Sequence, residues 1–151
     1  MAAVASWEDK IKQDIRIIYK GDMVYENLTQ KIIGAAIEVH KHLGPGLMEK
    51  CYECAMVYEL QQLGLDVKTQ VPVPIIYKGI DLNKDSLVKD CLQLDILVED
   101  TVIVELKSVE TVKDVHHKQL LTYMKLTDKK VGLLINFNES RLVDGIFRKV
   151  M

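Results

Sequence analysis

The chain has 151 residues, a formal net charge of −2, 48% hydrophobic residues and 28% charged residues. This length fits one domain with its own core, and the composition is that of an ordinary globular protein. The slight negative charge argues against a dedicated, sequence-independent nucleic-acid binder, which usually carries a basic excess. No apolar stretch is long enough to span a bilayer, so we expect a soluble, cytoplasmic protein with no membrane partner.

The first helical pattern begins after an N-terminal extension, which we expect to cover residues 1–24 and to precede a folded domain over residues 25–151. Apolar residues recur at helical spacing from about Leu28 to Leu43, which predicts a helix. Gly44-Pro45 ends it, because glycine favours the left-handed cap and proline prevents continuation.

A second helix is predicted from about Leu47 or Glu49 to Leu63, with Gly64 as its cap. Cys51 and Cys54 lie in this segment as a CxxC pair. A four-thiolate metal site needs further ligands and the sequence has no second CxxC, so we interpret both thiols as small, buried or half-buried hydrophobes on a helix. A metal or redox role for the pair is the alternative.

The period then changes to that of strands. Val67 to Tyr77 is rich in β-branched residues but contains Pro72 and Pro74, which predicts an edge or partly unpaired strand before a turn at Lys78-Gly79. Cys91 to Val98 and Thr101 to Val109 both alternate between apolar and polar positions, as strands do.

A third helix is predicted from about Val115 to Leu126. The nearly all-apolar run from Val131 to Phe137 predicts a fully buried strand, and Leu142 to Met151 a last short element. The predicted order is helix, helix, three strands, helix and strand. This order predicts an α/β domain in which a mixed sheet is flanked by helices.

Three charged residues interrupt strands that otherwise favour burial. Asp95 lies within LQLDILV, and Glu105 and Lys107 lie within TVIVELKSV. Glu105 and Lys107 share a face because side chains two apart on a strand do so. If Asp95 opposes Glu105, the two carboxylates suit Mg²⁺ or Mn²⁺, and the lysine beside them could act on a water or a phosphate. The alternative is a structural salt bridge of Lys107 with either carboxylate.

The register of this hairpin decides whether the carboxylates meet. They do so if Val98 pairs with Val102 across an odd loop, or if a bulge shifts the register by one. A two-residue loop at Glu99-Asp100 would instead put Glu105 on the other face. The loop lacks the glycine that two-residue turns favour, which supports the longer loop. Burial favours the same register, because it aligns two sets of apolar residues on one face: Leu94, Ile96 and Val98 with Leu106, Val104 and Val102.

Polar residues on two of the predicted helices are further candidates. On the second helix, Glu49 and Tyr52 are three residues apart and share a face. On the third helix, His116, Gln119 and Tyr123 form a polar stripe directly after the ExK strand. A solvated helix face is the alternative for this stripe.

Several long segments resemble the GxxExxY family of the PD-(D/E)xK nuclease superfamily. The naming motif is GLMEKCY, from Gly46 to Tyr52, and the resemblance runs from near Tyr25 to the C-terminus. It includes, in order, IIGAAIEVHKHLGPGL, IVELKSVE, HHKQLLTYMKL and VGLLINFN. His117 departs from the family, in which similar sequences tend to carry glutamate.

The resemblance implies a restriction-endonuclease-like αβββαβ core and a set of roles. Asp95 and Glu105 match the metal-binding residues, and Lys107 matches the lysine of the ExK pair. Glu49 matches the acidic residue that the first core helix contributes, and Gln119 and Tyr123 match positions that border the same site. His116 lies where the family often has histidine.

Two functions of different classes follow. The leading hypothesis is a Mg²⁺- or Mn²⁺-dependent nuclease that hydrolyses phosphodiester bonds in DNA or RNA. The alternative is a non-catalytic module on a nuclease fold that binds a nucleic acid or a protein, which the acidic balance of the chain favours. Fold does not fix function. Nothing in the sequence indicates an oligomer.

Overall fold

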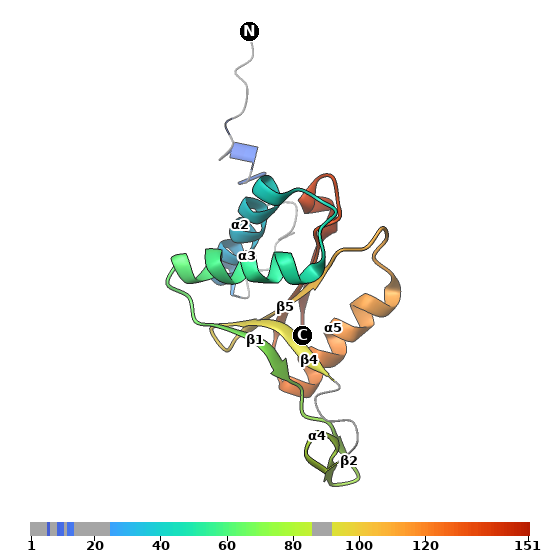
Figure 1. Ribbon diagram of the computed structural model, residues 1–151. Coiled ribbons are helices and arrows are strands. Elements are labelled where there is room, and N and C mark those ends of the chain that lie inside the picture. The colour runs from blue at the N-terminus through green and yellow to red at the C-terminus, as the bar shows by residue number, and fades with distance from the viewer. Residues whose placement is uncertain (1–5, 7–8, 11, 14–24, 86–91) are drawn as a thin grey trace.

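The computed structural model describes residues 6, 9–10, 12–13, 25–85 and 92–151. Most of the expected N-terminal extension and Cys91 lie outside the described residues. In the described part, a five-stranded sheet stands between two layers of helix, with α2 and α3 on one face and α5 on the other (Figure 1). The predicted α/β class with a mixed, helix-flanked sheet is confirmed.

The two helices of the first layer are α2 (Glu26–Leu43) and α3 (Glu49–Gln62). The predicted stop after Leu43 is confirmed: Gly44 has a φ of 65°, and its N–H donates to the carbonyl of His40 at 2.8 Å. Positive φ is easily reached by glycine because it has no Cβ. The helix therefore ends in time for the chain to turn back into α3, which packs against it.

The sheet has the order β1-β4-β5-β6-β7. Its strands are β1 (Val67–Pro72), β4 (Gln93–Val98), β5 (Val102–Lys107), β6 (Val131–Asn136) and β7 (Ile146–Val150). Helix α5 (Asp114–Thr127) connects β5 to the parallel strand β6, while the other neighbours are antiparallel. From α3 onward this includes the expected αβββαβ order, to which the 3₁₀ turn η1 (Leu142–Gly145) and β7 add a second edge.

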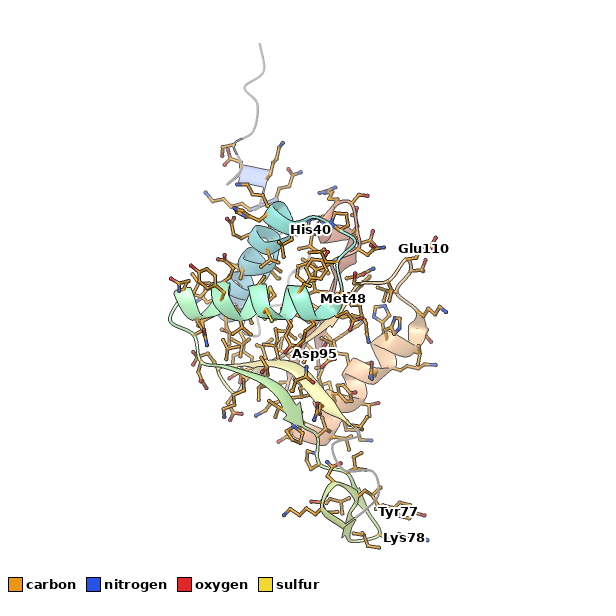
Figure 2. The ribbon with its side chains drawn as sticks, viewed as in Figure 1. His40, Met48, Tyr77, Lys78, Asp95 and Glu110 are labelled. Carbon is orange, nitrogen blue, oxygen red and sulfur yellow. The ribbon has the colours of Figure 1, made fainter. Side chains whose placement is uncertain are left out.

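The segment expected as one strand from Val67 to Tyr77 is divided. β1 lies at the sheet edge, as predicted, and ends at Pro72 because proline has no N–H to continue the ladder. The strands β2 (Ile76–Tyr77) and β3 (Ile80–Asp81) form a separate hairpin, followed by α4 (Leu82–Asp85). Tyr77 and Lys78 lie at its tip, away from the sheet (Figure 2).

The hairpin of β4 and β5 has the register predicted from burial. Val98 pairs with Val102 and Ile96 with Val104. Glu99 and Asp100 both have positive φ, 52° and 50°, as a tight I′ turn requires even without glycine. Thr101 follows as the additional residue that gives the loop its odd length.

One part of the predicted face alignment is wrong. Ile96 and Val98 pack beneath α2 and α3, but Leu94 packs in the cluster on the α5 side. Gln70 in the neighbouring strand has a φ of 50°, and this left-handed residue interrupts the alternation of side chains at that point of the sheet. β1 and β4 therefore exchange faces along their length.

Helix α5 approaches the sheet closely at one glycine. A Cβ on Gly132 in β6 would lie 2.8 Å from Leu120 Cδ1 and 2.9 Å from Met124 Sδ. Both side chains are fully buried, so the layer has little room to shift. In the part of the chain that the structure describes, no helix is long and apolar enough to cross a membrane.

We expect opposite effects from adding one methyl group at two glycines. Gly132→Ala should lower the free energy of unfolding by about 1–3 kcal/mol, because it overpacks the contact between α5 and β6. Gly34→Ala in α2 should raise it by about 1 kcal/mol, since its Cβ meets nothing within 4 Å and alanine favours helix. Urea denaturation measures both values, and equal effects would contradict this close approach.

Candidate active site

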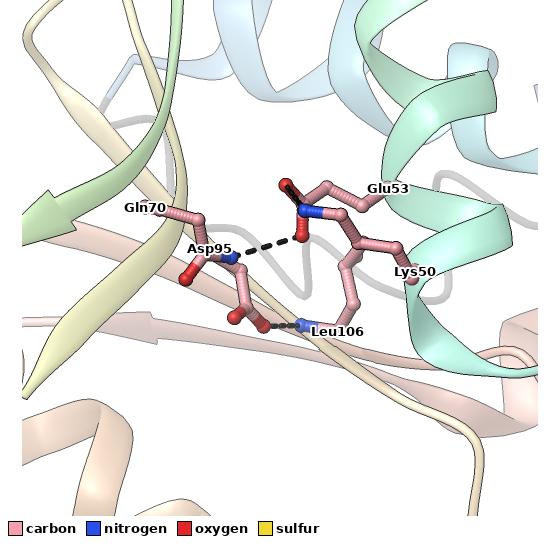
Figure 3. A network of polar contacts seen from close by, with 5 residues as sticks. All are labelled: Lys50, Glu53, Gln70, Asp95 and Leu106. Carbon is pink, nitrogen blue, oxygen red and sulfur yellow. Dashed lines mark hydrogen bonds and ion pairs between the residues drawn. The ribbon is translucent and has the colours of Figure 1, made fainter.

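Asp95 and Glu105 meet where β4 and β5 separate. The backbone N–H of Asp95 donates to Glu105 Oε1 at 3.1 Å, and the N–H of Leu106 donates to Asp95 Oδ2 at 2.9 Å. Each carboxylate therefore accepts a backbone N–H from the opposite strand. Figure 3 shows the Asp95 carboxylate at the Leu106 amide.

Burial makes the charged forms of both carboxyl groups unfavourable. It raises the pKa of Asp95, although the Leu106 amide opposes the shift. The pKa of Glu105 rises to about 9, first because of burial and then because of the negative charge of Asp95. Glu105 is only 5% exposed. Two such acids at one point of the fold favour a shared proton or a bound cation.

Lys107 lies next on the same face of β5. Its positive charge lowers the pKa of Asp95 and of Glu105, against the effect of burial, so the amine lies near both. Among the described residues, no ion pair within 4.0 Å joins it to either carboxylate. The arrangement thus differs from a closed salt bridge, which was the alternative for these three residues.

A third carboxylate comes from α3. Glu53 is 7% exposed, accepts a hydrogen bond from Gln70 Nε2 at 3.0 Å and pairs with Lys50 Nζ at 3.3 Å. Its negative charge contributes to the raised pKa of Asp95. In Figure 3, Gln70 and Lys50 converge on Glu53 beside Asp95.

Glu53 was missed in the sequence, although one signal pointed to it. Its spacing to Met56 and Leu60 places it on the buried face of α3, where an acid is unusual. Glu49, the residue expected in this role, is exposed one turn earlier. Its negative charge acts on His116, where it raises the pKa.

Two residues of the predicted polar stripe of α5, Gln119 and Tyr123, contact each other. Gln119 Nε2 donates to the hydroxyl of Tyr123 at 2.8 Å, and Tyr123 is 4% exposed. Tyr123 packs with Ile103, which lies on the same face of β5 as Glu105. The two residues therefore border the sheet face that carries the ExK pair.

His116 lies at the start of α5, where it closes a cap. Its Nδ1 accepts a hydrogen bond from the N–H of Lys113 at 3.0 Å. Burial lowers the pKa of His116, followed by the positive charges of Lys107 and Lys113. The side chain lines a pocket with the loop that leaves β5, whose other lining residues are Val109, Glu110, Thr111 and Lys113.

Tyr52 fixes the loop before α3. Its buried hydroxyl donates to the carbonyl of Gly44 at 2.6 Å and accepts from the N–H of Leu47 at 3.1 Å. Its ring stacks on Phe137, with centroids 4.4 Å apart. Ser108, directly after Lys107, donates its hydroxyl to the Leu47 carbonyl at 2.6 Å. The start of α3 is thereby tied to the end of β5.

Within the described residues, no group of three or more His, Cys, Asp or Glu side chains is arranged to hold a metal ion. The donors that do meet are Asp95 and Glu105, with Glu53 nearby. Carboxylate oxygens suit Mg²⁺ and Mn²⁺, and Mg²⁺ usually keeps several waters and needs only one or two protein carboxylates. A bound cation would also relieve the repulsion that raises the pKa of Glu105, so the residues fit such an ion.

Cys51 and Cys54 lie on exposed positions of α3 as free thiols. The prediction that they are buried or half-buried is wrong, because both side chains are exposed. Neither belongs to a three-residue metal-binding group among the described side chains.

Comparison with protein families gives one assignment. The family model of the PD-(D/E)XK nuclease superfamily matches residues 26–149, which span the sheet and its helices. Comparisons with curated proteins and with solved structures gave no match. The chain belongs to the PD-(D/E)XK nuclease superfamily.

Removing the Glu105 charge should stabilise the metal-free protein at alkaline pH. The raised pKa of Glu105 means that the folded state holds a proton which the unfolded state releases above its ordinary value of 4.5. Stability is therefore lost as pH rises through that value, and the loss continues up to about 9. Glu105→Gln should raise the melting temperature by several degrees at pH 8–9, where about 1 kcal/mol corresponds to about 2–4 °C.

Thermal melts of both proteins at pH 7, 8 and 9 in the presence of a chelator measure this effect. Burial lowers the pKa of His116 and of His117, so these two side chains contribute little to the pH dependence in this range. A wild type that gains stability between pH 7 and 9 relative to Glu105→Gln would contradict the proposed burial of the acid.

Proposed function

We propose that this chain is a Mg²⁺- or Mn²⁺-dependent nuclease that hydrolyses phosphodiester bonds in DNA or RNA. The observation that carries the proposal is the meeting of Asp95 and Glu105, both with raised pKa, beside an amine that neutralises neither in an ion pair. Membership of the nuclease superfamily supports a nucleic acid as the substrate class. The GxxExxY group is the proposed branch, on the motif from Gly46 to Tyr52.

Asp95 and Glu105 would hold the ion, and Glu53 is the acid of α3 best placed to complete or adjust the ligand set. A bound divalent cation supplies positive charge to a phosphoryl oxygen and lowers the pKa of a water. Glu49, one turn before Glu53, has a different proposed place: its exposed carboxylate lies toward His116, at the rim of the site.

Lys107 would position the attacking water or stabilise the negative charge that develops on the phosphate. Its amine lies close enough to act on both carboxyl groups, yet it is not held by either in an ion pair. A donor that is already in place when charge develops stabilises the transition state without reorganisation. Gln119 and Tyr123, joined by their hydrogen bond, would contact the backbone phosphate or the water from the side of α5.

A non-catalytic binding module is the second candidate. The net charge of −2 favours it, because phosphate backbones are bound mainly through lysine and arginine. Such a module would retain the fold but would not need Lys107 or a metal. The boundary of the domain at residue 25, and a cytoplasmic location, stay predictions.

Cleavage should depend on Lys107. With Mn²⁺ or Mg²⁺, wild type should cut at least one of single- and double-stranded DNA and RNA. Lys107→Ala should lower the rate by about 10²–10³-fold, the cost of removing one preorganised donor. Cys51→Ser with Cys54→Ser is the matched control: it changes exposed thiols on α3 and should cut at the wild-type rate. If wild type cuts no substrate with either metal, the binding-module function takes precedence.

Metal binding should depend on the two carboxylates. Mn²⁺ at 100 times its Kd should stabilise the wild type by about 2.7 kcal/mol, because it binds only the folded state. Asp95→Asn with Glu105→Gln should abolish this increase in melting temperature, and Lys107→Ala should retain it. An equal increase in the double variant would place the metal elsewhere.

A further inference from the structure

The backbone of Gln70 is unusual for its position. It lies inside β1 with a φ of 50°, a left-handed conformation that residues with a Cβ rarely adopt. Thr69 pairs with Ile96 and Val71 with Leu94, so no residue is inserted and Gln70 stands opposite Asp95. Strain of this kind persists where the surrounding structure enforces it, and it is concentrated at functional sites.

The left-handed residue changes the face to which β1 contributes. Val67 packs into the core beneath α2 and α3, whereas Val71 packs with the cluster on the α5 side. Regular alternation would put these two residues on one face, because they are an even number apart. The change occurs at Gln70, whose side chain thereby reaches α3.

Gln70 makes its contact with the third acid of the site. Its Nε2 donates to Glu53 Oε2 at 3.0 Å, while Lys50 pairs with Glu53 Oε1 at 3.3 Å. The Lys50 side chain is 69% exposed, so its hold on the carboxylate is screened by water. The half-buried amide is therefore the more persistent of the two partners.

An amide suits this role better than a cation would. It fixes the orientation of the Glu53 carboxylate but does not neutralise it, so the negative charge stays available to a metal held by Asp95 and Glu105. Removing a group that orients a ligand in this way typically lowers metal affinity by about 10–100-fold.

We propose that Gln70 is a positioning residue, which retains a strained backbone because that conformation aims its amide at Glu53 and holds this carboxylate beside Asp95. The inference rests on the proposed metal-dependent function. In this role Gln70 couples β1 to Glu53, the acid of α3.

The test is Mn²⁺ affinity, measured by calorimetry on the full chain. Gln70→Gly permits the same φ without strain but removes the amide, and it should weaken Mn²⁺ binding about 10-fold or more. Lys78→Gly is the matched control, because Lys78 also has a φ of 50° but lies in the turn of the distant hairpin. It should leave the affinity within about 2-fold of wild type, by the usual neutrality of exposed positions.

Two further variants separate positioning from folding. Gln70→Asn tolerates the left-handed conformation, but its shorter amide should not reach Glu53, so it should weaken Mn²⁺ binding as Gln70→Gly does. Glu53→Gln should weaken binding too, and adding Gln70→Gly to it should cause no further loss. Unchanged affinity in both Gln70 variants, or additive losses in the double variant, would overturn the inference.

Asp95→Asn distinguishes a wrong role for Gln70 from a wrong metal site. If it abolishes Mn²⁺ binding while the Gln70 variants bind as wild type does, the metal site stands and the role of Gln70 is wrong. If Mn²⁺ binds Asp95→Asn as it binds wild type, the proposed site is wrong and the role of Gln70 falls with it.

Discussion

The exchange of amides and carboxylates between β4 and β5 is the contact on which the site depends. The N–H of Asp95 donates to the Glu105 carboxylate and the N–H of Leu106 to the Asp95 carboxylate, so each acid accepts an amide from the opposite strand. Buried amides need an acceptor, and the two carboxylates supply one for each of these N–H groups. The same exchange holds the two acids together at a point where the strands begin to separate.

Holding two carboxyl groups together inside the fold is electrostatically unfavourable. Apolar layers on both faces of the sheet exclude water, so burial raises the pKa of both acids, and the negative charge of Asp95 raises that of Glu105 further. A fold selected only for stability would place apolar residues there. Lys107, which lies near both acids but forms no ion pair with them among the described residues, leaves that cost only partly compensated.

Three further sets of contacts in the described structure hold the elements around Asp95 and Glu105 in place. Tyr52 and Ser108 tie the loop before α3 to the end of β5, which fixes where α3 begins. The buried side chain of Asn136 donates to the Val109 carbonyl and accepts from its N–H, which anchors the segment that leaves β5. Helix α5 is held close to β6 by the absence of a side chain at Gly132.

The sequence by itself determined the order of elements and the β4–β5 register, because period, turn residues and burial are local signals. It also indicated that Asp95, Glu105 and Lys107 gather, since charges within apolar strands need partners. Only the tertiary structure decided that β1 and β4 exchange faces at Gln70, and that Glu53 rather than Glu49 lies beside Asp95. Both depend on how α3 packs across the sheet, which is a contact between segments distant in sequence that no local pattern encodes.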